Sequence, residues 1–181
     1  MKHVIHIFGA SGSGTTTLGR YIAREKGWTH LDSDDYFWLP TDPPFVKKRP
    51  AEERVALMLR DLEAADHVVI TGSLTGWGDP LIPYFTLCIR TMLDQAIRLD
   101  RLHRREAERF GDRIEPGGDM YQHHQEFMDW AAQYDEGSVT MRSAAKHDAW
   151  QEIITCPVIT VNTEEKTEDV YTRLKSRGVF D

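Results

Sequence analysis

Short apolar runs alternate with longer amphipathic stretches along most of the chain. The runs are rich in β-branched residues and end at glycine, aspartate or another polar residue, which predicts strands buried on both faces. We expect five such strands, at residues 4–8, 29–31, 67–71, 85–90 and 157–161.

The stretches between these runs carry apolar residues at three- and four-residue steps, which is the spacing of one helical face. Val55, Met58, Leu59 and Leu62 are an example. We expect helices over 16–26, 51–65, 93–110, 144–150 and 167–177, and a further helix with Met120, Phe127, Ala131 and Tyr134 on one stripe. Strands that alternate with helices imply an α/β fold with a parallel sheet and helices on both of its faces.

Composition narrows the class of protein. A length of 181 residues suits one α/β domain. The formal net charge of −7 argues against a general nucleic-acid coat, which needs a net basic face. Cys88 and Cys156 form no CxxC pair, no apolar run is long enough to span a membrane, and the apolar stretch near the first residue is too short for a signal peptide. We therefore expect a cytoplasmic protein without a membrane span, and its oligomeric state stays open.

The first strand leads into a glycine-rich loop, Gly9-Ala10-Ser11-Gly12-Ser13-Gly14-Thr15-Thr16. The loop has the pattern GxxxxG followed by two threonines, and it stands between a strand and a helix, as a phosphate-binding loop does. Glycine accepts the backbone angles that turn several N–H groups toward one phosphate, and the helix N-terminus adds partial positive charge. The residues predicted to bind phosphate are Gly9, Ser11, Gly12, Ser13, Gly14, Thr15, Thr16 and Thr17. The Thr16 hydroxyl stands where it would ligate Mg²⁺, and the alternative is an ordinary Gly/Ser turn.

The chain resembles the P-loop kinases, specifically the nucleoside-monophosphate kinase and shikimate kinase group. The resemblance is carried by this loop, five strands in the expected order along the chain, an acidic motif after the second strand and an arginine-rich segment after the fourth. The resemblance implies a three-layer P-loop NTPase fold with strand order 2-3-1-4-5. It implies one kinase-like domain over residues 1–181, with a lid at about 101–122. It also implies that ATP and Mg²⁺ are the cofactors and that the γ-phosphate passes to a small hydroxyl or phosphate acceptor.

Position 15 departs from the family pattern. The family has a lysine there, which reaches the β- and γ-phosphates, whereas this chain has Thr15. Phosphoryl transfer depends mostly on electrostatic stabilisation, so either another cation compensates or the protein is a weak or inactive kinase. A non-catalytic, nucleotide-binding regulatory protein is therefore one alternative. A sulfotransferase is another, because residues 13–18 resemble the SGTT loop of that class, although Gly12 replaces its usual basic residue.

Three carboxylates follow the second strand, at Asp32, Asp34 and Asp35. In the kinase group an aspartate at a similar DxD position holds the acceptor or Mg²⁺, and the resemblance maps best onto Asp32 and Asp34. If the backbone stays extended, a spacing of two points both side chains the same way. The alternative is a helix N-cap followed by an acidic first turn, with Asp35 favoured as the cap.

Arginines crowd the segment after the fourth strand. Arg101 and Arg105 share one helix face and belong to an RLxxR sequence that resembles the start of a nucleotide-kinase lid. Arg109 and Arg113 are also one turn apart, so these four are the predicted compensating cations. Lys47, Lys48 and Arg49, in an exposed, mobile loop over 39–50, are the reserve. The alternative is a solvated helix face, which is favoured for Arg98 and Arg104.

Overall fold

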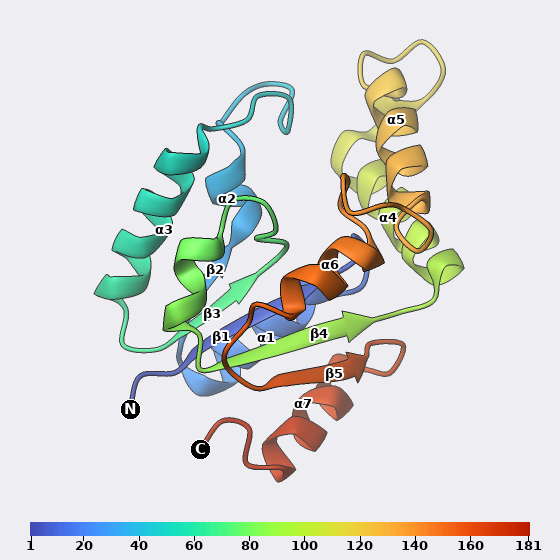
Figure 1. The fold of residues 1–181 in the computed structure, drawn as a ribbon. Helices are drawn as coiled ribbons and strands as arrows, with labels where there is room; N and C mark the ends of the chain where they lie inside the picture. The colour runs from blue at the N-terminus through green and yellow to red at the C-terminus, as the bar shows by residue number, and fades with distance from the viewer.

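A parallel sheet runs through the middle of the molecule, with helices packed on both faces (Figure 1). The computed structural model describes residues 1–181. The strands are β1 (Val4–Gly9), β2 (Thr29–Asp32), β3 (Val68–Thr71), β4 (Leu87–Met92) and β5 (Val158–Asn162). Their spatial order is β2-β3-β1-β4-β5, and every neighbouring pair is parallel. The predicted fold class and strand order are confirmed.

Seven α-helices and two 3₁₀ helices connect and extend these strands. The α-helices are α1 (Thr15–Lys26), α2 (Ser33–Phe37), α3 (Ala51–Ala64), α4 (Gln95–Phe110), α5 (Tyr121–Ala132), α6 (Ala144–Gln151) and α7 (Thr167–Ser176). The 3₁₀ helices are η1 (Asp79–Tyr84) and η2 (Gly111–Ile114). Sequence periodicity predicted six of the α-helices. It missed α2, which is too short to show a periodic face.

The fourth strand begins later than predicted. The apolar run from Phe85 suggested a strand over 85–90, whereas β4 covers Leu87–Met92. The reason is η1, a 3₁₀ helix with prolines at its start and near its end, which carries the chain as far as Tyr84. The Phe85 N–H still bonds the Ile82 carbonyl, so Phe85 belongs to the end of η1 rather than to the sheet.

The two faces of the sheet have different cores. Ile5 and Ile7 point to the face covered by α1 and α7, where the packing is mainly aliphatic. Val4 and Phe8 point to the other face, where α3 and η1 supply aliphatic side chains and α6 supplies the aromatic ring of Trp150. Because successive side chains alternate between the faces of a strand, a strand buried on both faces is mostly apolar, as the first run in the sequence predicts, and His6 is its one buried polar side chain.

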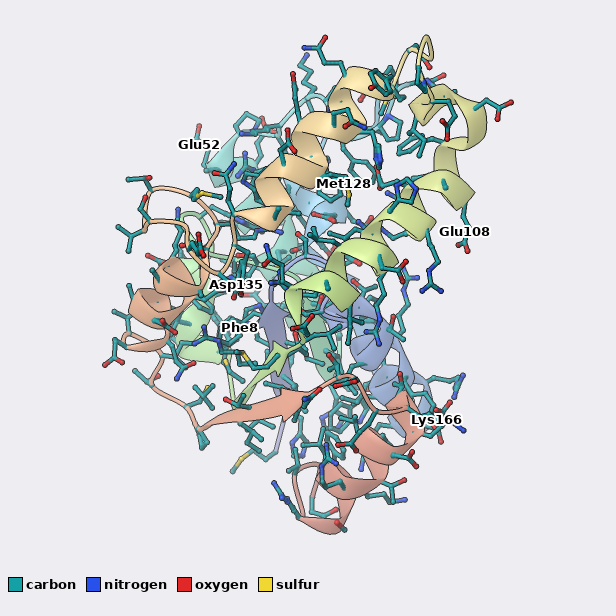
Figure 2. All side chains as sticks on the ribbon, turned by 90° about the vertical axis from the view of Figure 1, so that its right-hand side faces the viewer. Phe8, Glu52, Glu108, Met128, Asp135 and Lys166 are labelled. Atoms are coloured by element: carbon teal, nitrogen blue, oxygen red, sulfur yellow. The ribbon has the colours of Figure 1, made fainter.

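The helices α4 and α5 lie side by side and project from one end of the sheet (Figures 1 and 2). This hairpin includes the segment that the sequence assigned to a lid. Phe110, Ile114 and Met120 form a small cluster at its tip, and Phe45 packs against that cluster. None of the helices combines the length and the apolar character that a membrane crossing requires.

The segment over 39–50 has more backbone structure than a free loop. The Leu39 N–H donates to the Lys47 carbonyl at 2.8 Å, and the Arg49 N–H donates to the Phe37 carbonyl at the same distance. The chain therefore returns on itself as a short antiparallel turn. Lys47 and Lys48 are exposed, as predicted.

Candidate active site

The glycine loop joins β1 to α1 and lies at the carboxyl end of the sheet. Gly14 precedes the first residue of α1 with φ of 83°, and no side chain caps the helix. The first N–H groups of α1 are therefore available to an anion, and the helix dipole favours negative charge there. Gly12, with φ of 80°, lies so close to α4 that an added Cβ would come within 2.6 Å of the Arg98 carbonyl oxygen. Glycine at this position lets the loop lie against α4.

Ser13 supports the loop from inside the protein. Its hydroxyl donates to the Ala10 carbonyl at 2.7 Å and meets the Thr91 hydroxyl at 2.7 Å. Its N–H also bonds the Ala10 carbonyl, at 3.1 Å, while the Ser13 carbonyl accepts from the Thr163 hydroxyl at 2.7 Å. Ser13 thus holds the shape of the loop, whereas Ser11, Thr15, Thr16 and Thr17 keep some contact with solvent.

Thr16 and Asp32 bring the glycine loop and the acidic motif together. The Thr16 hydroxyl donates to Asp32 Oδ2 at 3.2 Å. A hydroxyl and a carboxylate are hard oxygen ligands, which suits Mg²⁺. No cluster of three or more His, Cys, Asp or Glu side chains that could hold a metal is present. A magnesium ion here would therefore need further oxygens from phosphate or water, as is usual for Mg²⁺ at phosphate sites.

The acidic motif is also a helix cap. Asp32 Oδ1 accepts a hydrogen bond from the Asp34 N–H at 3.1 Å, and α2 begins at Ser33. The interpretation of Asp35 as the cap is wrong, because Asp32 occupies that position. The expected extended backbone through Asp34 is also wrong, since Asp34 lies in the first helical turn. Asp32 still reaches Thr16 with its second oxygen, so capping and contact with the loop coexist.

Asp34 interacts electrostatically with several arginines. Its carboxylate contacts solvent, but protein atoms surround it closely enough to remove much of its hydration. This desolvation raises the pKa of Asp34 above its ordinary value, and Asp32 adds to the rise. Arg142 opposes the rise most strongly among the neighbouring arginines, followed by Arg105 and Arg109. The structure therefore places Asp34 within the electrostatic reach of two of the predicted lid arginines.

A cavity of about 560 Å³ lies on the other side of the loop. Its walls are the start of α1, Arg101 and Arg105 of α4, and residues 163–167 before α7. Lys166 marks this last wall in Figure 2. The Arg101 guanidinium donates to the Thr163 carbonyl at 3.2 Å and would lie 3.8 Å from a Cβ on Gly14. Arg101 thus flanks the loop from the cavity side.

The other arginines of the lid segment are paired. Arg105 and Arg109 lie 3.9 and 3.8 Å from the same Glu106 carboxylate. Arg113 pairs with Asp119 at 2.7 Å, at the far end of the hairpin. Arg104 pairs with Asp100 on the exposed face of α4, as the solvated-face interpretation predicts.

That interpretation is wrong for Arg98, which is 1% exposed and pairs with Asp135, the residue labelled near the end of α5 in Figure 2. In the sequence, an arginine among many charged residues of a helix is expected on the solvated face. In the structure Asp135, which follows α5, covers it.

Sequence reasoning missed one arginine of the site. Arg142 comes from the loop before α6, and its Nη1 lies 3.4 Å from the Ser11 hydroxyl. Its guanidinium also lies over the Trp130 ring of α5, at 5.3 Å from the ring centre. Burial lowers the pKa of Arg142, and Asp34 opposes that shift. No motif or spacing in the sequence links Arg142 to Ser11, because 131 positions separate them.

A buried hydrogen-bonded chain supports the loop that carries Arg142. The Tyr134 hydroxyl meets His147 Nδ1 at 2.7 Å, and His147 Nε2 meets the Ser73 hydroxyl at 3.0 Å. Burial lowers the pKa of His147 to about 3, so the imidazole is neutral at physiological pH. Ser143 caps α6 by accepting the Lys146 N–H at 3.0 Å. These bonds tie the Arg142 loop to α6 and to the end of β3.

Comparison with known proteins supplies the family. No known protein-family model matches the chain. The uncharacterized protein YqaC of Bacillus subtilis (strain 168) is 40% identical over 164 residues, which covers 91% of this chain and 90% of YqaC. A probable gluconokinase of Xenopus tropicalis is 30% identical over 79 residues, covering 39% of this chain and 42% of that protein. A cytidylate kinase of Methanoregula boonei is 28% identical over 109 residues, covering 54% and 58%.

Solved structures supply the fold. A shikimate kinase from Bacteroides thetaiotaomicron superposes with a TM-score of 0.60 at 17% identity, covering 98% of this chain and 99% of the kinase. A gluconokinase from Sinorhizobium meliloti 1021 superposes with a TM-score of 0.51 at 15% identity, covering 98% and 96%. The chain therefore belongs to the same family as Bacillus subtilis YqaC, and it has the fold of P-loop kinases.

Proposed function

We propose that the protein is an ATP-dependent small-molecule kinase, with residues 1–181 as one domain and a lid at about 101–122. The observation that carries the proposal is the contact between Thr16 and Asp32. It joins a helix N-terminus with unpaired N–H groups to the acidic end of β2. Donors for phosphate and oxygens suited to Mg²⁺ thereby lie at one edge of the sheet, where ligands of open α/β sheets bind.

The nucleotide would lie along the glycine loop. Backbone N–H groups of Gly12, Gly14, Thr15 and Thr16 would cradle the phosphates, and the adjoining cavity would receive the nucleoside. Thr16 and Asp32 would hold Mg²⁺, which supplies neutralisation of phosphate charge when it is bound.

The acceptor would lie beside Asp34. Its carboxylate would orient the acceptor hydroxyl and take its proton as the new oxygen–phosphorus bond forms and the bond to the leaving ADP breaks. Where the acceptor is itself a phosphate, Asp34 would only orient it. Arg101, Arg105 and Arg109 would face the phosphate oxygens once the lid closes.

A regulatory, non-catalytic role is the second candidate, because Thr15 replaces the lysine of this loop. Such a protein would use the same cavity and loop to bind a nucleotide. It would transfer no phosphate, and the response would lie in a conformational change instead. Binding and transfer must therefore be measured separately.

Two measurements test the proposal. Calorimetry compares Mg-ATP with the sulfate donor 3′-phosphoadenosine-5′-phosphosulfate, and we expect only Mg-ATP to bind. Transfer of labelled γ-phosphate is then followed over a panel of sugars, sugar acids, nucleosides and nucleotides. Binding without transfer to any acceptor would favour the regulatory candidate, and preference for the sulfate donor would favour a sulfotransferase. Binding of neither ligand would refute a nucleotide function.

A further inference from the structure

Position 15 holds threonine instead of lysine, so a positive charge at the phosphates must come from another residue. The arginines of the structure are the candidates. Every arginine between positions 90 and 142, except Arg101 and Arg142, lies within 4.0 Å of a carboxylate. A paired guanidinium is already neutralised in part, so it contributes less to an incoming anion. Arg101 and Arg142 are therefore the two cations of this segment that keep their full charge for a ligand.

These two arginines lie on different sides of the glycine loop. Arg101 lines the cavity together with Thr163 and the residues before α7. Arg142 contacts Ser11, which is not part of that cavity, and it interacts electrostatically with Asp34. If the nucleoside fills the cavity, the phosphates run along the loop toward the aspartates of β2 and α2. Arg142 then stands at the terminal phosphate, and Arg101 stands nearer the nucleoside.

Two of the three reserve cations of the 39–50 segment, Lys48 and Arg49, are engaged elsewhere. Arg49 donates to the Tyr36 carbonyl at 3.0 Å, and the Lys48 ammonium lies 5.8 Å from the centre of the Phe37 ring. Both therefore lie against α2. Lys146, the next basic residue after Arg142, has its ammonium group beside Gly76. A Cβ added at Gly76 would lie 3.7 Å from Lys146 Nζ. None of these contacts is made to the glycine loop.

We infer that Arg142 supplies the positive charge that Thr15 does not, by binding the γ-phosphate at the Ser11 end of the loop. The inference rests on the proposed function, since it assumes that ATP occupies the loop. A guanidinium can hold two phosphate oxygens at once, and here it would meet the negative charge that develops on the transferred phosphoryl group. It forms no bond to phosphorus, and the proton of a hydroxyl acceptor still goes to Asp34.

The protein positions Arg142 before any ligand arrives. Trp130 of α5 lies against its guanidinium, and Ser143 starts α6 immediately after it. The buried chain from Tyr134 through His147 to Ser73 holds the next turn of α6 in place. A cation held in this way loses little conformational freedom on binding, which is the requirement for electrostatic preorganisation. Because Trp130 belongs to the helical hairpin, a movement of the lid would also move the support of Arg142.

A binding experiment tests the inference without knowledge of the acceptor. Calorimetry measures the affinity of each variant for Mg-ADP and for the Mg complex of a non-hydrolysable ATP analogue, AMP-PNP. We expect Arg142→Gln to weaken AMP-PNP by about 10- to 100-fold, the usual cost of a lost charge-assisted hydrogen bond, and ADP by less than about 3-fold. Arg142→Lys, which keeps the charge, should lie between Arg142→Gln and the parent. Arg104→Ala is the matched control, because it removes an exposed arginine already paired with Asp100.

The double variant Arg142→Gln/Thr15→Lys sharpens the test. If Arg142 replaces the lysine, restoring the lysine should recover at least about 10-fold of AMP-PNP affinity, whereas Thr15→Lys in the parent should add less. Circular dichroism on each variant separates a binding loss from unfolding. Equal losses of ADP and AMP-PNP, or no loss of either, would overturn the role of Arg142 while leaving nucleotide binding intact. Failure of the parent to bind either nucleotide would instead overturn the proposed function.

Discussion

The candidate site has two parts, a loop wall and an arginine wall, which are built in opposite ways. The loop wall, residues 9–17, has no charged side chain, and what it offers a ligand is backbone N–H groups, small hydroxyls and the end of a helix dipole. The arginine wall flanks the loop on two sides and offers guanidinium groups, from Arg101 of α4 on the cavity side and from Arg142, in the loop before α6, at Ser11. In the usual phosphate loop one segment supplies both kinds of group, because a lysine stands among the glycines. Here shape and charge come from different parts of the chain.

This separation implies two classes of variant. Changes in the loop wall should act through backbone geometry and should alter nucleotide affinity. Changes in the arginine wall should act through charge, and they should alter turnover and the binding of a triphosphate more than the binding of ADP. The following predictions test whether the two walls behave so differently.

The largest effect is expected at Asp34. Asp34→Asn should lower kcat by about 10²- to 10⁴-fold, the usual contribution of a positioned general base, and should change ATP affinity by less than about 3-fold. Asp35→Asn is the control, since Asp35 is exposed in the same helical turn. The measurement is steady-state kinetics with the acceptor found in the transfer panel. Equal kinetics in both variants would reduce Asp34 to a surface residue of α2.

The pH profile gives the same prediction a second readout. Desolvation raises the pKa of Asp34, and a base must be ionised to accept a proton. For a hydroxyl acceptor, kcat/KM should therefore fall as the pH falls through that raised pKa, which lies above the ordinary value of about 3.9. The acidic limb should disappear in Asp34→Asn, and an unchanged limb would assign it to another group.

The next largest effect is expected at Gly14, in the loop wall. Gly14→Val should weaken ATP binding by about 100-fold or more, because valine resists the left-handed backbone and its branches would approach Thr163 and Arg101. Gly27→Val is the matched control, since Gly27 is also left-handed, with φ of 67°, but ends α1 in open space. Calorimetry should show parental affinity for the control. Parental affinity in Gly14→Val would place the nucleotide away from the loop.

A smaller effect is expected at Arg105. Arg105→Ala should lower kcat by about 10-fold, because Arg105 and Arg109 share the Glu106 carboxylate and the remaining arginine then pairs more closely with it. ATP affinity should fall by less than that. Arg104→Ala removes the adjacent arginine, which lies on the exposed face of α4, and should leave kcat and ATP affinity unchanged. If Arg105→Ala lowered kcat more than Arg142→Gln does, Arg105 rather than Arg142 would be the main compensating cation.

The last effect is expected on folding stability rather than on binding or turnover, and it comes from two buried histidines. Burial lowers the pKa of His6 to about 4 and that of His147 to about 3, against about 6.5 in an unfolded chain. The unfolded state therefore binds more protons below pH 6.5, and the free energy of unfolding should fall as the pH drops toward 4. We expect a loss of roughly 1–3 kcal/mol per histidine between pH 7 and 4.

Urea denaturation at pH 7 and pH 4.5 measures this loss. His147→Gln should reduce the pH dependence, while it also lowers stability at pH 7 because the bonds to Tyr134 and Ser73 are disturbed. His123→Gln, on α5, is the control and should keep the parental pH dependence. A pH dependence that survives in His147→Gln would assign the effect to His6, whose Nε2 lies 2.9 Å from the Gly72 carbonyl oxygen.

The amino-acid sequence by itself determined the parallel sheet and the position of the glycine loop, because apolar runs, helical periodicity and a glycine pattern between a strand and a helix are signals that are short along the chain. The strand order came from the resemblance to the P-loop kinases rather than from these signals. The sequence did not reveal α2, because one and a half turns are too few for a periodic signal and because it favours Asp32 as a ligand and Asp35 as the cap.

Only the tertiary structure decided which charges meet. Arg98 looks solvated along the chain and is buried against Asp135, and Arg113 looks like a site residue and pairs at the hairpin tip. Arg142 carries no local signal, and it reaches Ser11 only because α5 and α6 bring its loop back over the sheet. An ion pair depends on a few ångströms of separation between distant segments, and no pattern within one segment records that distance.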